Sequence, residues 1–170
     1  MSTGKIDTFQ NRLELSTIAE RRVLGMLLYW NINAKRIGQE TWMPEWVHGK
    51  LRFSNSESIR TIRHFPDIDV CKALIEVKCS PNGDKYDSVF IEKDSFDTCS
   101  MLFSYGIKVI IVWMVGEKTF LAQWVNKINP TEPNTPRQDV NGSRTPYLNI
   151  NKSDLIPFAD FRLELVDAME

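Results

Sequence analysis

Polar and apolar positions near the start of the chain predict an amphipathic helix. Thr17 and Glu20 form a T-x-x-E capping box directly ahead of an apolar run, a pattern typical of a helix N-terminus. We therefore predict a helix over residues 17–30. Glu20, Leu24 and Leu27 then share one face, because side chains three and four positions apart are neighbours on a helix. Residues 31–65 show no clear period, and no element is predicted there.

The pattern changes to that of short strands after residue 67. Apolar positions at 68–70 lead into a candidate turn at 71–72, and residues 74–79 are rich in strand-forming side chains. Together these segments predict a β-hairpin. Residues 80–84 (SPNGD) are a loop signal. A third strand is predicted at 86–91 and is expected to pair antiparallel with the second.

A second helix and a strongly apolar strand follow. Asp94 is a good N-cap residue, and Gly106 stands where a helix-terminating glycine belongs. Four side chains of this helix are expected to face inward: Phe96, Cys99, Leu102 and Phe103. Residues 107–115 (IKVIIVWMV) form a near-continuous apolar run, as expected of a strand buried on both faces. A further strand is expected at 119–125.

The order of these elements predicts the fold class. Helix, three strands, helix and strand imply an α/β fold with a mixed central sheet flanked by helices. At 170 residues the chain has the length of one domain, with its core over about residues 17–125. Residues 129–146 are expected to form a long surface loop. The apolar tail at 147–170 is expected to pack back on the domain or on a partner.

Composition narrows the class of protein. The chain is 42% hydrophobic and 25% charged, as expected of a packed globular protein. The apolar run at 109–115 is shorter than the roughly 20 residues that a spanning helix needs, and the N-terminus has no signal-peptide core. We therefore expect a cytoplasmic protein that is not secreted and has no membrane partner. The three cysteines lack a CxxC spacing, so we expect reduced core residues and no structural zinc site.

The charge distribution is uneven along the chain. The net charge is -1, but residues 1–65 carry ten Lys/Arg against six Asp/Glu, so this part is +4 and the remainder is -5. A basic N-terminal part can supply contacts to nucleic-acid phosphates, although a solvated charge distribution explains the excess equally well. Candidate phosphate contacts are Arg60 and Arg63, with Lys93 weaker. Trp42 and Trp46 are expected to pack a loop, with base stacking as the alternative.

Acidic side chains and a lysine are concentrated in the predicted hairpin. If the chain turns at 71–72, Asp67 lies across from Glu76, where paired residues have Cβ atoms about 5 Å apart. Glu76 and Lys78 project from the same face of one strand. Two converging carboxylates repel each other unless a cation is present, and oxygen ligands suit Mg²⁺ or Mn²⁺. Such an ion activates water toward a phosphodiester, so we predict hydrolytic chemistry.

The segment PDIDVCKALIEVK (residues 66–78) resembles the signature of the PD-(D/E)xK nuclease superfamily, which includes restriction endonucleases and junction resolvases. The resemblance implies a restriction-endonuclease-like α-β-β-β-α-β core and metal-dependent DNA cleavage. It implies that Asp67 and Glu76 bind the metal and that Lys78 completes the catalytic centre. Glu20 is similarly placed to a helical glutamate that many members add to the metal site, with the capping box as its structural alternative. Asp69, on the same face as Asp67, could replace it.

Several alternatives stay open at this point. The main hypothesis is a bacterial or phage-encoded endonuclease on DNA, acting as a homodimer because cutting two strands needs two symmetry-related centres. One alternative is a non-catalytic nucleic-acid-binding module on the same fold, and another is an interaction protein whose carboxylates are solvated. Glu76 and Lys78 could also form a salt bridge at a sheet edge. His48 and His64 are isolated and are expected to be surface or loop residues.

Overall fold

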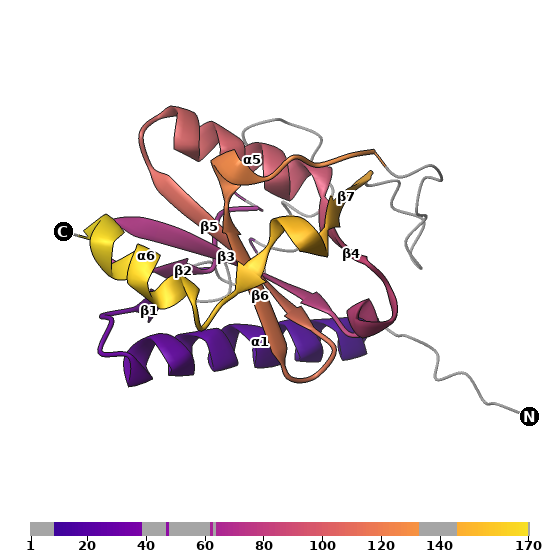
Figure 1. The fold of residues 1–170 in the computed structure, drawn as a ribbon, viewed down its shortest axis with the longest axis horizontal. Helices are drawn as coiled ribbons and strands as arrows, with labels where there is room; N and C mark the ends of the chain where they lie inside the picture. The colour runs from indigo at the N-terminus through magenta and orange to yellow at the C-terminus, as the bar shows by residue number, and fades with distance from the viewer. Residues whose placement is uncertain (1–8, 39–46, 48–61, 63, 133–145, 170) are drawn as a thin grey trace, which may run out of the picture.

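The computed structural model describes residues 9–38, 47, 62, 64–132 and 146–169, and Figure 1 shows their arrangement. The predictions made for some residues lie outside these ranges: Trp42, Trp46, His48, Arg60 and Arg63. In the part of the chain that is described, no helix is long and apolar enough to cross a membrane.

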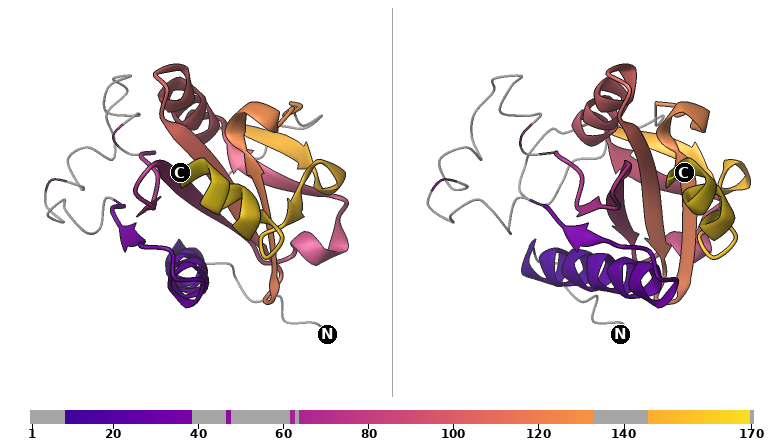
Figure 2. Two further views of the ribbon diagram at one scale, coloured as in Figure 1. Left: turned by 60° about the vertical axis from the view of Figure 1, so that its left-hand side comes forward. Right: turned by 90° about the vertical axis from the view of Figure 1, so that its left-hand side faces the viewer.

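A six-stranded mixed sheet forms the centre of the molecule. Its strands, in spatial order, are β1 (Lys35–Arg36), β2 (Ile68–Asp69), β3 (Ala73–Ser80), β5 (Lys108–Val115), β6 (Thr119–Trp124) and β8 (Ile156–Pro157). Only β3 and β5 pair parallel, and every other neighbouring pair is antiparallel. Helices lie on both sides of this sheet (Figure 2). The predicted α/β class with a mixed sheet flanked by helices is confirmed.

The first helix, α1 (Phe9–Tyr29), is longer than predicted. Thr17 lies inside it, so the capping-box interpretation is wrong. The preceding residues include Arg, Leu, Glu and Gln, which favour helix and carry it upstream of the T-x-x-E signal. The helix ends at Tyr29, and Asn31 in the turn that follows has the left-handed conformation common after a helix C-terminus, with φ 60°. Val23 and Leu27 are fully buried on its inner face.

The predicted hairpin between β2 and β3 is confirmed, with Ile68 paired to Ile75 and Asp69 paired to Leu74. Its turn needs a left-handed residue, and Cys71 takes that position with φ 72°. The Asp69 carboxylate supports the turn by accepting the backbone N–H of Cys71 at 3.0 Å. Cys71 is therefore exposed, and its prediction as a core residue was wrong.

The other two cysteines are free thiols further inside the protein, Cys79 half-buried and Cys99 buried. Burial raises the pKa of Cys79 to about 11. Burial also raises the pKa of Cys99 well above its usual value, and the neighbouring Glu76 carboxylate adds to the effect. Both thiols therefore remain protonated and unreactive near neutral pH.

The third strand, β4 (Ser88–Glu92), does not pair with β3 as expected. It forms a separate two-stranded sheet with β7 (Tyr147–Asn151), a strand of the C-terminal tail. Strand β3 pairs with β5 along its whole length on one edge and with β2 at Leu74 and Ile75 on the other. The chain after β3 passes through a short 3-10 turn (Gly83–Lys85) before β4 begins. Strand β4 therefore pairs with a segment that is remote in sequence.

Helix α5 (Lys93–Ser104) follows β4 directly. It begins two residues earlier than an Asp94 N-cap implies, with Glu92 at the N-cap position. Cys99 and Leu102 face inward as expected, but Phe103 is 39% exposed, so its prediction as an inward-facing residue was wrong. Gly106 ends the helix with φ 84°, which confirms its predicted role.

Strand β5 separates two hydrophobic cores, because successive side chains of a strand point to opposite faces. Its residues Ile110, Val112 and Met114 pack into the core below α1 and α6 (Phe161–Met169). Alternate residues pack against α5, β4 and β7: Val109, Ile111, Trp113 and Val115. All seven side chains are at most 5% exposed, which confirms a strand buried on both faces.

The C-terminal tail packs onto this fold. Phe158 and Phe161 are fully buried in the first core, and their rings contact Trp30 and Trp124 at centroid distances of 5.1 Å and 5.3 Å. Of the two possibilities expected for the tail, packing on the domain or on a partner, the described residues 147–169 show packing on the domain.

Replacing Phe158 by alanine is expected to lower the free energy of unfolding by about 3–5 kcal/mol, the usual cost of removing a buried aromatic side chain. Urea denaturation measures this change. Leu163→Ala is the matched control, because Leu163 lies in the same tail and is 74% exposed. An equal effect of both substitutions would contradict the packing described here.

Candidate active site

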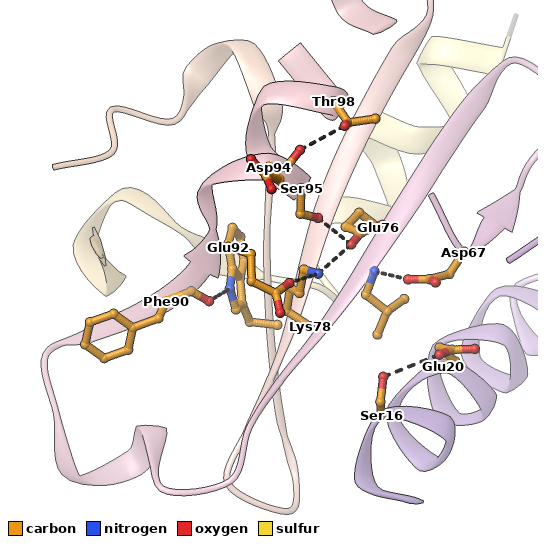
Figure 3. A network of polar contacts seen from close by, with 12 residues as sticks. Ser16, Glu20, Asp67, Glu76, Lys78, Phe90, Glu92, Asp94, Ser95 and Thr98 are labelled. Carbon is orange, nitrogen blue, oxygen red and sulfur yellow. Dashed lines mark hydrogen bonds and ion pairs between the residues drawn. The ribbon is translucent and has the colours of Figure 1, made fainter. Parts of the chain in front are cut away.

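The β2–β3 hairpin brings Asp67 beside Glu76. Extending the strand register by one residue places Asp67 across from Glu76, as predicted. The backbone N–H of Asp67 donates to the Ile75 carbonyl at 3.0 Å. The N–H of Val77 in turn donates to Oδ2 of Asp67 at 2.8 Å. Figure 3 shows the carboxylate held in this way against the edge of β3.

Glu76 is a buried carboxylate, only 4% exposed. Its Oε1 accepts a hydrogen bond from Ser95 Oγ at 2.7 Å. The same oxygen forms an ion pair with Lys78 Nζ, also at 2.7 Å. Its Oε2 is buried and has no hydrogen-bond partner among the described residues. An unpartnered buried oxygen is costly unless it serves a ligand. Glu76 therefore presents an oxygen that is available to a cation.

Lys78 projects from the same face of β3 as Glu76, as predicted. Its Nζ lies 2.7 Å from Glu76 Oε1 and 3.1 Å from Glu92 Oε2. Burial alone would lower the pKa of Lys78, but these two carboxylates raise it well above its usual value. Lys78 is therefore a charged ammonium at neutral pH, and it lies inside the fold between two acidic groups. A salt bridge on a solvent-facing edge does not describe this pair, because Glu76 is only 4% exposed and β3 lies between β2 and β5 in the sheet.

Asp67 experiences negative charge from two directions. Burial, then Glu76, then Glu20 raise its pKa well above the usual value of an aspartate, while Lys78 and the Val77 N–H act in the opposite direction. The negative charges that raise the pKa of Asp67 thus come from both β3 and α1. Such a group is protonated or needs a cation nearby.

Glu20 lies on α1, which packs against the face of β3 opposite to α5, and its negative charge acts on Asp67. It is 7% exposed. Its carboxylate forms an ion pair with Arg36 on β1 and accepts a long 3.5 Å hydrogen bond from Ser16. Because α1 begins at Phe9, Glu20 does not cap the helix.

Two other candidates are engaged elsewhere. Asp69 forms an ion pair with Lys35 at 3.3 Å as well as supporting the hairpin turn, so it is directed away from Glu76. Lys93 forms an exposed ion pair with Asp97, one turn along α5. Asp67 is thus the aspartate of the motif that faces the buried acidic groups.

The acidic residues fit a hard divalent cation in their chemistry. In the ranges that the structure describes, no three His, Cys, Asp or Glu side chains enclose a common point as metal ligands. Arg36 holds Glu20, while Lys78 and Ser95 hold Glu76. The donors nevertheless are all oxygens, and one oxygen of Glu76 is unpartnered. Mg²⁺ and Mn²⁺ prefer this donor set.

Three polar residues of the site were missed or misplaced by sequence reasoning. Glu92 contacts Lys78, and Ser95 contacts Glu76, but neither carries a motif. His64 lies in a turn, as expected, yet it is half-buried near the Lys78–Glu92 pair. Burial and the Lys78 charge lower the pKa of His64, so it is neutral at physiological pH. Only a correct placement of β4 could have indicated Glu92.

Comparison with known proteins identifies the fold. No family model and no curated protein matches the sequence. The structure is similar to Hjc, a Holliday junction resolvase from Archaeoglobus fulgidus, with a TM-score of 0.51 and 14% identity over 86% of this chain and 94% of that chain. It also resembles D212, a nuclease from a fusselovirus, with a TM-score of 0.48 and 10% identity over 99% of this chain and 96% of that chain. The match to Hjc confirms the restriction-endonuclease-like fold that residues 66–78 led us to expect.

Proposed function

We propose that this restriction-endonuclease-like chain is a Mg²⁺- or Mn²⁺-dependent endonuclease that hydrolyses DNA phosphodiester bonds. The observation that carries the proposal is the contact between Glu76 and Lys78, buried beside Asp67, with one Glu76 oxygen lacking a partner. A buried ion pair often contributes no more to stability than apolar residues of similar volume would. The free-energy cost of burying these charges is explained if Glu76 and Lys78 have a chemical role.

Each residue then has a distinct role. Asp67 and Glu76, with Glu20, would hold the metal ion. When bound, this ion polarises a phosphodiester oxygen and lowers the pKa of a water molecule. The raised pKa of Lys78 favours an ammonium that stabilises charge developing on the phosphate, over a neutral amine that acts as a base.

The substrate class proposed is DNA, with branched and linear forms both to be tested. Arg60 and Arg63 remain candidate phosphate contacts. Lys93 is a weaker candidate because Asp97 already pairs with its ammonium. A homodimer, in which two copies cut the two strands, is part of the same proposal.

The second candidate is a nucleic-acid-binding module on the same fold without catalysis. One observation favours it: among the described residues, no three potential ligands surround a common point. This candidate predicts DNA binding without cleavage.

Incubation with supercoiled plasmid and with branched DNA separates the two candidates. Wild-type protein is expected to cut at least one substrate with Mg²⁺ or Mn²⁺ and none with EDTA, and Glu76→Gln is expected to cut neither. Asp97→Asn removes an exposed carboxylate of α5 and should cut like wild type. Binding without cutting under every condition would favour the non-catalytic module.

Divalent metal is expected to stabilise the wild-type protein. A ligand at 100 times its Kd adds roughly 2.7 kcal/mol to stability, which raises Tm by about 5–10 °C for a chain of this size. Differential scanning calorimetry with Mn²⁺ against EDTA measures the shift. Asp67→Asn should abolish the shift, whereas Asp69→Asn should retain it because Asp69 pairs with Lys35 instead. The reverse result would make Asp69 the ligand.

A further inference from the structure

Glu92 supplies Lys78 with a second carboxylate that belongs to no part of the sequence motif. It is the last residue of β4. Its Oε2 lies 3.1 Å from Lys78 Nζ, and its Oε1 accepts a hydrogen bond from the Tyr147 hydroxyl at 3.5 Å. The Lys78 ammonium lowers the pKa of Glu92, so the pair is ionised. Figure 3 shows Lys78 lying between Glu92 and Glu76.

The backbone of Glu92 is anchored from two directions. Strand β7 pairs with β4, and Tyr147 is the register partner of Glu92. The indole Nε1 of Trp113 donates to the Phe90 carbonyl at 3.1 Å, and Trp113 is the β5 partner of Lys78. Trp113 thus links β4, which its side chain contacts, to β3, with which its own strand pairs at Lys78.

The junction between β4 and α5 contacts both charged residues of the E-x-K element, Glu76 and Lys78. Glu92 ends the strand and contacts Lys78, while Ser95, in the first turn of the helix, donates to Glu76 at 2.7 Å. Ser95 is fully buried. A single short segment therefore fixes the positions of two neighbouring charged side chains on β3.

We propose that Glu92 is a positioning residue that holds the Lys78 ammonium in place, with Tyr147 of the C-terminal tail orienting its carboxylate. The inference rests on the proposed function, because it assigns Lys78 a task in cleavage. A lysine side chain is flexible and needs partners to fix its position. The negative charge of Glu76 would be shared between a bound cation and Lys78. Glu92, which has no proposed role in metal binding, remains a carboxylate partner for the ammonium. The tail strand β7 then belongs to the active centre.

Steady-state kinetics of Glu92→Gln and Tyr147→Phe test this role. The Glu92 substitution keeps the shape and removes the charge, and we expect kcat to fall about 10- to 100-fold, as for other residues that support an active-site group. KM and DNA affinity should not change, since Glu92 does not touch substrate. Tyr147→Phe should show a smaller fall in kcat. Asp97→Asn, which removes the partner of an exposed lysine, is the matched control and should leave kcat unchanged.

A second readout does not depend on activity. The side-chain ammonium of Lys78 should give a ¹⁵N NMR signal protected from solvent exchange in the wild-type protein, and this signal should weaken or disappear in Glu92→Gln. An unchanged signal together with an unchanged kcat would overturn the inference, and so would a change confined to KM. A wild-type protein that cuts no DNA would instead overturn the proposed function. In that case loss of the signal in Glu92→Gln would still support the positioning of Lys78, and an unchanged signal would overturn it.

Discussion

Replacing Lys78 by methionine is expected to lower the single-turnover rate of DNA cleavage by about 10²- to 10³-fold, the usual cost of removing one group that stabilises transition-state charge. DNA affinity should change little, because the ammonium is paired with Glu76 and Glu92 and is not part of an exposed basic surface. Quench-flow or gel-based rate measurements at saturating protein would determine the effect.

Two controls separate catalysis from stability in this experiment. Removing Lys78 leaves buried carboxylates without their cation, which destabilises a fold, so the unfolding temperature of each variant must be measured first. Lys78→Arg keeps the positive charge, but its planar group differs in geometry, so it should restore stability more than rate. Lys127→Met removes an exposed lysine that pairs with Glu164 and should leave the rate unchanged. A folded Lys78→Met protein that cleaves as fast as wild type would refute the role of Lys78.

Asp67→Asn should abolish metal-dependent cleavage and at the same time stabilise the metal-free protein. The loss of rate is expected to be about 10³-fold or more, since a metal ion contributes several kcal/mol to the transition state. The gain in stability is expected to be on the order of 1 kcal/mol, as when other strained active-site groups are replaced. Asparagine keeps an oxygen for the Val77 N–H and removes the repulsion from Glu76 and Glu20.

The sign of the pH dependence follows from the pKa of Asp67, which is raised above its usual 3.8 in the folded protein. As pH rises from near 4 toward the folded pKa, the unfolded chain releases this proton while the folded protein keeps it, so the stability contributed by Asp67 falls. The asparagine variant lacks this loss. Urea unfolding in EDTA should therefore show a stability gain that is small near pH 4 and grows toward neutral pH. A gain that shrinks with rising pH would contradict the assignment.

Local parts of the site could be predicted because they depend on neighbouring residues. Counting across a hairpin that turns at 71–72 was enough to place Asp67 opposite Glu76, and a period of two placed Lys78 beside Glu76. The start of α1 could not be found in the same way. The T-x-x-E pattern at Thr17 matches a capping box, but the helix-forming residues before it extend the helix back to Phe9.

Remote pairing accounts for the rest of what was missed. Strand β4 was expected beside β3, whereas its partner β7 lies more than fifty residues further along the chain. No local pattern encodes that choice, because the two paired segments are remote from each other in sequence. The contact between Glu92 and Lys78 follows from this pairing. Sequence reasoning therefore identified the motif but not the residues that hold it.

The dependence of single-turnover DNA cleavage on Mn²⁺ concentration is the most direct test of a metal centre at Asp67 and Glu76. With wild-type protein and a labelled DNA substrate, the rate should be zero in EDTA and rise to a plateau as Mn²⁺ increases. Glu76→Gln should show no measurable rate at any Mn²⁺ concentration. A wild-type rate that does not depend on Mn²⁺, or a Glu76→Gln curve that matches the wild-type curve, would contradict the assignment.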